Sequence, residues 1–102
     1  MLELRPTCEN CNRTLPPESD LAMICSFECT FCKHCVDEIL ANVCPNCGGG
    51  FAPRPIRPSG NWKADNDLGH YPASIEVKHR AVEPLAHARF AAPISLIPPT
   101  NR

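Results

Sequence analysis

Eight cysteines lie within the forty residues between positions 8 and 47, and this density constrains the fold more than any other feature of the chain. Four steps in this stretch have the form C-x2-C, a tight turn that can place two thiolates on one tetrahedral ion. Eight thiolates fill two four-ligand sites with no ligand left over, so we expect two structural Zn²⁺ ions per chain. The predicted metal ligands are Cys8, Cys11, Cys25, Cys29, Cys32, Cys35, Cys44 and Cys47.

Closed sites of four thiolates are structural, because they keep no open position for water or substrate. No motif links the Ser, His and Asp residues of the chain, and we predict that the protein is not an enzyme. His34 lies between two predicted ligands, and because eight thiols already fill both sites we expect its side chain to face solvent. Iron also suits tetrahedral sulfur, but zinc is the usual ion of such sites.

A disulfide framework is the main alternative use of so many cysteines. Disulfides occur chiefly in secreted proteins, yet the opening residues MLELRP carry an early acid and lack the apolar stretch of a signal peptide. No apolar run approaches the ~18 residues of a membrane span, so we expect no membrane partner. We therefore expect a cytoplasmic protein with reduced thiols.

Residues 1–51 contain few large apolar side chains. A core of that size rarely supplies more than ~3–5 kcal/mol, whereas a structural zinc site contributes on the order of 10–16 kcal/mol of apparent binding free energy at neutral pH. We therefore predict that residues 1–51 form a small metal-stabilised domain, which unfolds or becomes molten when the metal is removed.

Short-range patterns predict the elements of this domain. Residues 21–24 are apolar and predict the first strand of a small hairpin, with residues 26–31 as its turn and return strand. Consecutive prolines predict an irregular loop over residues 15–20. Apolar residues at positions 36, 39, 40 and 43 share one helical face, so we expect a helix over residues 36–43 with Asp37 and Glu38 in its first turn.

Residues 52–102, which we call the tail, have a different composition. Eight of the twelve prolines follow residue 51, and residues 51–58 predict an extended, polyproline-like segment. Beyond residue 59 no apolar period is sustained, and five further prolines would interrupt any helix. We predict a mostly disordered tail, in which only residues 74–82 could form a short strand or a turn of helix.

Spacing alone leaves three ways to divide the cysteines between two ions. The sequential division is 8/11/25/29 with 32/35/44/47, and the interleaved division is 8/11/32/35 with 25/29/44/47. A shifted division is 8/11/29/32 with 25/35/44/47. The ambiguity arises because Cys32 could pair with either neighbouring cysteine, Cys29 or Cys35.

The centre CTFCKHC over residues 29–35 and the closing CPNC over residues 44–47 resemble a RING finger. Cys29 stands where most RING domains have histidine, so the resemblance is to the all-cysteine variant. It implies the interleaved cross-brace, in which the two ion sites take alternate cysteine pairs along the chain. It also implies a RING-like treble of loops, with a short β-hairpin and one α-helix lying between two zinc sites.

A second resemblance covers residues 1–58. The opening MLELRP, the following CENC and the segment ICSFECTFC over residues 24–32 resemble a family of short, uncharacterised bacterial cysteine-rich proteins. This resemblance implies a fold class and a bacterial cytoplasm, but it implies no chemistry.

Three functions are compatible with such a module, and we favour a non-catalytic protein-interaction or scaffold unit whose partner is another protein. Its contact surface would be the exposed side of the predicted helix or the proline-rich residues 51–58. These residues are already extended and would lose little conformational entropy on binding. A RING-type ubiquitin ligase is the second hypothesis. Asn10 precedes the second ligand, where such ligases usually carry an apolar residue, and Gly48 follows the last ligand, where many carry a cation.

A nucleic-acid-associated zinc protein is the third hypothesis, and charge argues against it. Residues 1–51 contain three basic and seven acidic side chains, and two Zn²⁺ on eight thiolates would lower their net charge from −4 to about −8. The tail carries seven basic and four acidic side chains, scattered as in a solvated segment. We therefore do not expect a nucleic-acid partner.

Overall fold

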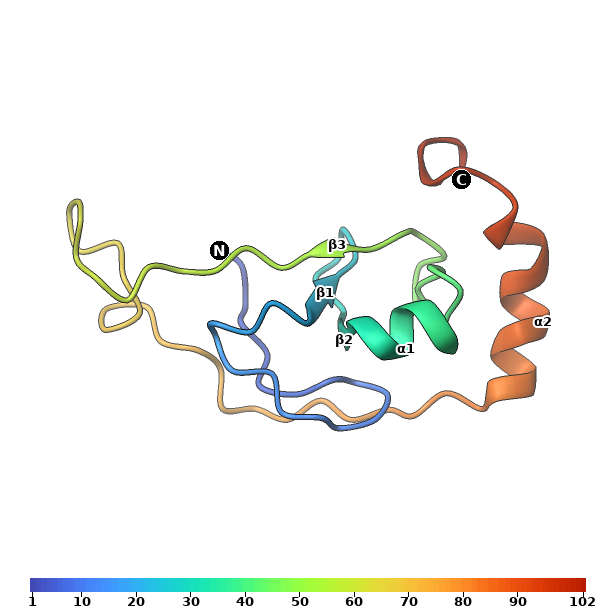
Figure 1. Ribbon diagram of the computed structural model, residues 1–102, viewed down its shortest axis with the longest axis horizontal. Coiled ribbons are helices and arrows are strands. Elements are labelled where there is room, and N and C mark those ends of the chain that lie inside the picture. The colour runs from blue at the N-terminus through green and yellow to red at the C-terminus, as the bar shows by residue number, and fades with distance from the viewer.

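The computed structural model describes residues 1–102 and contains one three-stranded antiparallel sheet in the order β2-β1-β3 (Figure 1). Strands β1 (Ala22–Ile24) and β2 (Thr30–Cys32) form a hairpin in which Met23 is paired with Phe31. Strand β3 (Ala52–Pro53) pairs with the other edge of β1. The hairpin expected over residues 21–31 is confirmed, and its return strand extends one residue further.

The interior beside this sheet is built largely from sulfur. Six of the twelve residues in the buried cluster are cysteines, and the largest apolar members include Leu15, Phe31 and Leu40. The Phe31 ring meets Phe51 edge-on, with ring centroids 5.4 Å apart and an interplanar angle of 77°. The apolar core is therefore small, as the composition predicted, and thiols occupy the space that larger side chains would otherwise fill.

Helix α1 spans Lys33–Glu38. Its first residue is three positions earlier than that of the helix expected over residues 36–43, and its last residue is five positions earlier. Ala41 and Asn42 have φ values of 54° and 56°, in the left-handed region that terminates a helix. Asp37 therefore lies in the last turn rather than the first, where it forms an ion pair with Lys33 at 3.1 Å. Of the four apolar positions expected on one face, Val36, Leu40 and Val43 are buried and Ile39 is half-buried, but a turn rather than a helix carries the later ones.

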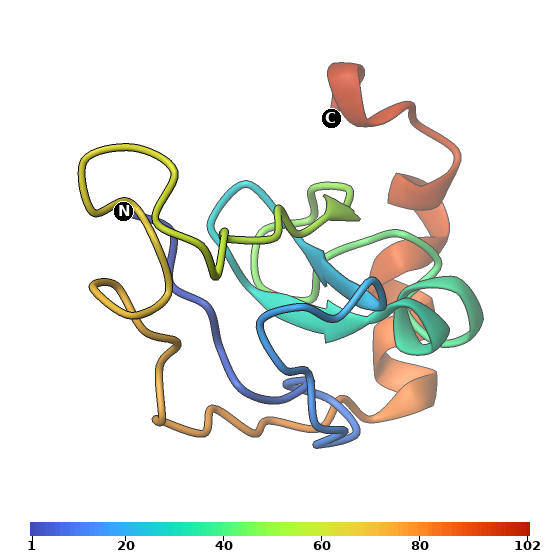
Figure 2. The same ribbon diagram turned by 60° about the vertical axis from the view of Figure 1, so that its left-hand side comes forward.

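The tail is not disordered, contrary to the expectation from its composition. It contains β3, helix α2 (Pro84–Ser95) and the 3₁₀ helix η1 (Pro99–Asn101). Figures 1 and 2 show the tail running along one side of the cysteine-rich half, reversing direction at the far left, and returning along the other side to α2. None of the helices is both long and apolar enough to cross a membrane.

The prolines of α2 lie near its two ends, so they interrupt few of its hydrogen bonds and do not prevent the helix. Pro84 is the first helical residue, where a backbone N–H would have no intrahelical acceptor. The Glu83 carboxylate caps this end by accepting hydrogen bonds from the N–H groups of Leu85 and Ala86, at 3.2 and 2.6 Å. Pro93 lies inside the helix but in its last turn, so few hydrogen bonds follow it.

Residues 72–83, which we call the strap, connect the far loop to α2 as an extended segment. The Ser74 N–H donates to the Leu4 carbonyl at 3.0 Å, and the Arg80 N–H donates to the Glu9 carbonyl at 2.6 Å. Residues 74–82 form neither a strand nor a helical turn. Hydrogen bonds to the N-terminal residues, rather than regular structure, hold the strap in place.

Arg54 anchors the beginning of the tail. It is 3% exposed, and its guanidinium donates to the carbonyls of Arg5, Leu15 and Pro16 at distances of 2.9 to 3.3 Å. Arg57 donates in the same way to the Leu2 carbonyl at 2.8 Å. These two cations therefore bind backbone rather than facing solvent, and this fixes the path of residues 51–58.

Candidate metal centres

The first cluster consists of four thiols whose sulfur atoms all lie within 4.8 Å of one another: Cys8, Cys11, Cys32 and Cys35. The sulfur atoms of Cys11 and Cys32 are 3.7 Å apart. A tetrahedron with Zn–S bonds of about 2.3 Å has edges of about 3.8 Å, so this spacing fits one shared ion. It is much longer than the ~2.05 Å of a disulfide, and all eight cysteines are free.

Local geometry brings the four thiols of the first cluster together. The Cys11 N–H points at the Cys8 sulfur at 3.5 Å, and Asn12 completes this turn with a φ of 63°. Cys32 ends β2, while Cys35 lies in the first turn of α1. The junction between strand and helix therefore presents its two sulfurs to the N-terminal turn.

The second cluster contains Cys25, Cys44 and Cys47, whose sulfur atoms also lie within 4.8 Å of one another. Cys29 lies beside this group but outside that limit. Its backbone carbonyl accepts from the Cys25 N–H at 3.2 Å, so both residues belong to one turn at the end of the β1–β2 hairpin. The second cluster is thus less tightly assembled than the first.

Glycines shape the turn that presents Cys44 and Cys47. Gly48 has a φ of 76°, and its N–H donates to the Cys44 carbonyl at 2.8 Å. The Gly49 N–H points at the Cys47 sulfur at 3.4 Å. A residue with a β-carbon would be strained at position 48, so the glycine run after the last cysteine allows the turn to close.

Two asparagine side chains donate hydrogen bonds to sulfur, one in the first cluster and one at Cys29 beside the second. Asn10 Nδ2 lies 3.3 Å from the Cys35 sulfur, and Asn46 Nδ2 lies 3.4 Å from the Cys29 sulfur. Each asparagine immediately precedes the second cysteine of a C-x2-C pair. In the sequence Asn10 is notable only as a departure from ligases and Asn46 is not notable, although the repeated N-C step is a signal that could have found both.

Burial raises the pKa of Cys35 and of Cys44, so both thiols hold their protons more tightly than a free cysteine does. The pKa of Cys29 is also raised, mainly by burial, although the hydrogen bond from Asn46 opposes the shift. A bound cation would reverse this preference, because a metal ion stabilises the thiolate. Soft sulfur donors, tetrahedral spacing and N–H donors aimed at sulfur all fit such an ion.

The structure divides the predicted ligands as the interleaved arrangement does, with Cys29 at the margin of its group. Neither the sequential nor the shifted division matches these two clusters. His34, between two of the cysteines, is exposed as expected. The other three histidines bond elsewhere. His70 Nδ1 lies 2.9 Å from Asp67 Oδ1, and His79 and His87 reach the carbonyl oxygens of Asn10 and Leu40 through Nε2, at 3.0 and 2.9 Å.

Comparison with known proteins agrees with the resemblance found in the opening residues. Residues 1–57 match a family described as "Protein of unknown function (DUF1272)". An uncharacterised protein of Rhizobium meliloti (strain 1021) is 54% identical over 74 residues, which cover 72% of this chain and 81% of that protein. No solved structure matches. With more than half of its length matched, and with two cysteine clusters that could each hold a metal ion, the chain belongs to the DUF1272 family.

Proposed function

We propose that this protein is a RING-like module with two structural Zn²⁺ ions that serves as a non-catalytic protein-interaction or scaffold unit in the reducing cytoplasm. The observation that carries the proposal is the first cluster, in which four free thiols from two separate segments, the N-terminal turn and the β2–α1 junction, share the spacing of one tetrahedral ion. The proposed ligands of the first ion are Cys8, Cys11, Cys32 and Cys35. Those of the second are Cys25, Cys29, Cys44 and Cys47.

Zinc is the proposed ion because it favours four thiolates in a closed tetrahedron and needs no redox partner. Such sites supply folding free energy where the core is small, and half of this buried cluster is cysteine. With every thiolate bound to an ion, neither site would retain a position for substrate. The proposed role is therefore structural, and the biological activity would be binding.

Exposed apolar side chains support a binding role. Phe27, at the tip of the hairpin turn between Cys25 and Cys29, is 72% exposed, and Trp62 and Ile75 are 87% and 96% exposed. A partner that covered any of them would gain the free energy of burying apolar surface. The contacts of the arginines count against a nucleic-acid role, because Arg54 and Arg57 are occupied by backbone carbonyls and are not free to meet phosphate.

Native mass spectrometry with metal analysis tests the metal part of the proposal. We expect two zinc ions per chain and no protons on sulfur, and we expect the folded spectrum to be lost with a chelator. A single iron, a mixture of disulfides, or a chelator-treated sample that keeps its native spectrum would refute it. A ubiquitin-transfer assay with the zinc-loaded chain then separates scaffold from ligase, since robust transfer would overturn the non-catalytic role.

A further inference from the structure

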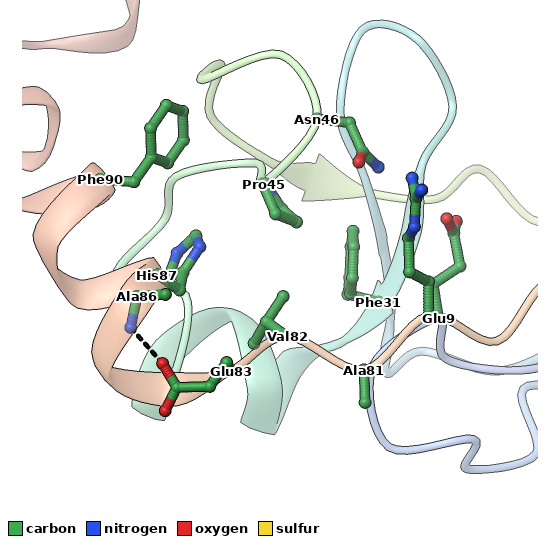
Figure 3. Close-up of a pocket in the computed structure, with 11 residues that line it drawn as sticks. Glu9, Phe31, Pro45, Asn46, Ala81, Val82, Glu83, Ala86, His87 and Phe90 are labelled. Carbon is green, nitrogen blue, oxygen red and sulfur yellow. Dashed lines mark hydrogen bonds between the residues drawn. The ribbon is translucent and has the colours of Figure 1, made fainter.

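A groove of about 340 Å³ separates the cysteine-rich half from α2, and its size is in the range of small-molecule sites. Phe31 and Val82 line its middle, and Figure 3 shows Phe90 at the end formed by α2. Glu9 and Asn46 lie together on the opposite side, with Pro45 between the two ends (Figure 3). Glu9 and Asn46 make one end of the groove polar, and Phe90 gives the α2 end an aromatic surface beside Glu83 and His87.

The Glu9 carboxylate is the unusual feature of the polar end. Glu9 is 7% exposed, and the hydrogen bonds from Arg5 Nη1, at 2.7 Å, and from the Thr30 N–H both end on Oε2. The other oxygen, Oε1, has no hydrogen-bond partner in the chain. Asn46 uses Nδ2 to donate to sulfur, which leaves its Oδ1 as a second acceptor beside the groove. Two oxygen atoms that can accept further hydrogen bonds thus face one end of the groove.

Arg80 supplies a positive charge at the same end. Its backbone N–H donates to the Glu9 carbonyl at 2.6 Å, which fixes the two residues side by side. Arg80 lines the groove, and its side chain forms no ion pair and no hydrogen bond within the chain. A guanidinium in this state is a ready partner for a carboxylate, which it can bind through two parallel hydrogen bonds.

We propose that this groove binds a free α-amino acid with an apolar side chain. The ammonium group would donate to Glu9 Oε1 and Asn46 Oδ1, and the carboxylate would pair with Arg80. The side chain would lie along Val82 toward Phe90, where an aromatic ring gains additional contact. Arg5 already pairs with Oε2 of Glu9, so a zwitterion matches the site by giving a donor to Glu9 Oε1 and a carboxylate to Arg80, whereas a ligand with only one charged group leaves one of these two without a partner. This goes beyond the proposed scaffold role and does not require it.

Titration of the metal-loaded full-length protein with L-phenylalanine, followed by amide NMR, tests the proposal. We expect saturable shifts at residues lining the groove. Phenethylamine lacks the carboxylate and 3-phenylpropionate lacks the ammonium group, so each should bind about tenfold more weakly, the effect of losing one charged hydrogen bond. Arg80→Gln should weaken L-phenylalanine by a similar factor and leave phenethylamine unchanged. Arg89→Gln, an exposed site on α2 without side-chain contacts, is the matched control.

The same spectra show whether each variant is folded, so a loss of binding is not confused with unfolding. Absence of saturable shifts in the folded wild-type chain would overturn the proposal. Equal affinity for all three compounds would also overturn it, because the two charges would then have no role. Arg80→Gln binding L-phenylalanine as well as Arg89→Gln does would have the same consequence.

Discussion

The amide group of Asn10 donates to the Cys35 sulfur at 3.3 Å, and the same side chain accepts the Val82 N–H on its oxygen at 2.8 Å. One side chain therefore joins the first cysteine cluster to the strap. His79 strengthens the connection through its Nε2, which lies 3.0 Å from the Asn10 carbonyl. Any change that displaces Cys35 should be transmitted to the strap through Asn10.

Replacing Asn10 with alanine should therefore loosen the strap without removing the first cluster. The Val82 N–H would lose its acceptor, and we expect its hydrogen exchange to accelerate about tenfold, the effect of one lost hydrogen bond. Hydrogen-exchange mass spectrometry of the metal-loaded protein measures this. Arg13→Ala, at an exposed position in the same N-terminal turn with no side-chain hydrogen bond, is the control. Equal protection of the strap in both variants would contradict the prediction.

The two clusters should fill in a fixed order. All four thiols of the first cluster already lie within 4.8 Å of one another, whereas Cys29 must move to join Cys25, Cys44 and Cys47. With one equivalent of Zn²⁺ we expect the first cluster to be loaded and the second to be empty. Alkylation followed by peptide mapping reads this directly, because metal-bound thiolates are protected. Uniform labelling of all eight cysteines, or protection of the second cluster first, would disprove the order.

Zinc affinity should rise with pH. Burial raises the pKa of Cys35 and Cys44, so in the metal-free fold these thiols stay protonated, and an ion must displace their protons. Each proton released makes the affinity change about tenfold per pH unit, and zinc should therefore be lost as the solution is acidified. Competition with a chromophoric chelator at several pH values measures the slope. An affinity independent of pH would show that no proton is displaced.

The stability of the metal-free chain should change with pH in the opposite direction to the zinc affinity. A raised pKa means that the folded form holds protons that the unfolded chain releases above its ordinary thiol pKa of about 8.5. Any residual fold without metal is therefore most stable below that pH and loses stability as the pH rises. Circular dichroism of the chelator-treated protein at pH values on both sides of the thiol pKa checks this sign.

Arg54→Lys should destabilise the attachment of the tail. A guanidinium reaches the Arg5, Leu15 and Pro16 carbonyls together, and an ammonium group cannot reproduce this fork. We expect a loss of about 2–3 kcal/mol in the free energy of unfolding, because charged donors and buried carbonyls lose partners. Urea unfolding of the metal-loaded protein measures the change, with the exposed Arg89→Lys as control. Equal midpoints for the two variants would show that Arg54 is not an anchor.

The cysteine clusters and the hairpin could be predicted from the sequence because both depend on short-range spacing. The C-x2-C steps at residues 8–11 and 44–47 each form a local turn, and the apolar run before Cys25 needs only its neighbour across a short turn to form a sheet. The predicted bounds of the helix were wrong because apolar periodicity indicates which side chains are buried, not where a helix ends. Ala41 and Asn42, both with positive φ, end the helical path and bring Cys44 into the second cluster.

The tail could not be predicted because its order comes from contacts that leave no local pattern. Arg54 binds the carbonyl of a residue 49 positions earlier, and Val82 binds a side chain 72 positions earlier. The local sequence of a proline-rich segment does not show whether its arginine faces water or binds backbone carbonyls. Low apolar periodicity predicts disorder only where the segment has no such partners.

The path of the strap also has a consequence for biosynthesis. All eight cysteines precede residue 48, whereas the strap and α2 begin only at residues 72 and 84. On the ribosome the thiols therefore emerge first, and the proposed ions can be captured while the remaining half is still being translated. Closure of the strap over the N-terminal turn would then follow metal capture, and ribosome pausing after the cysteines would give a metallated but open nascent chain.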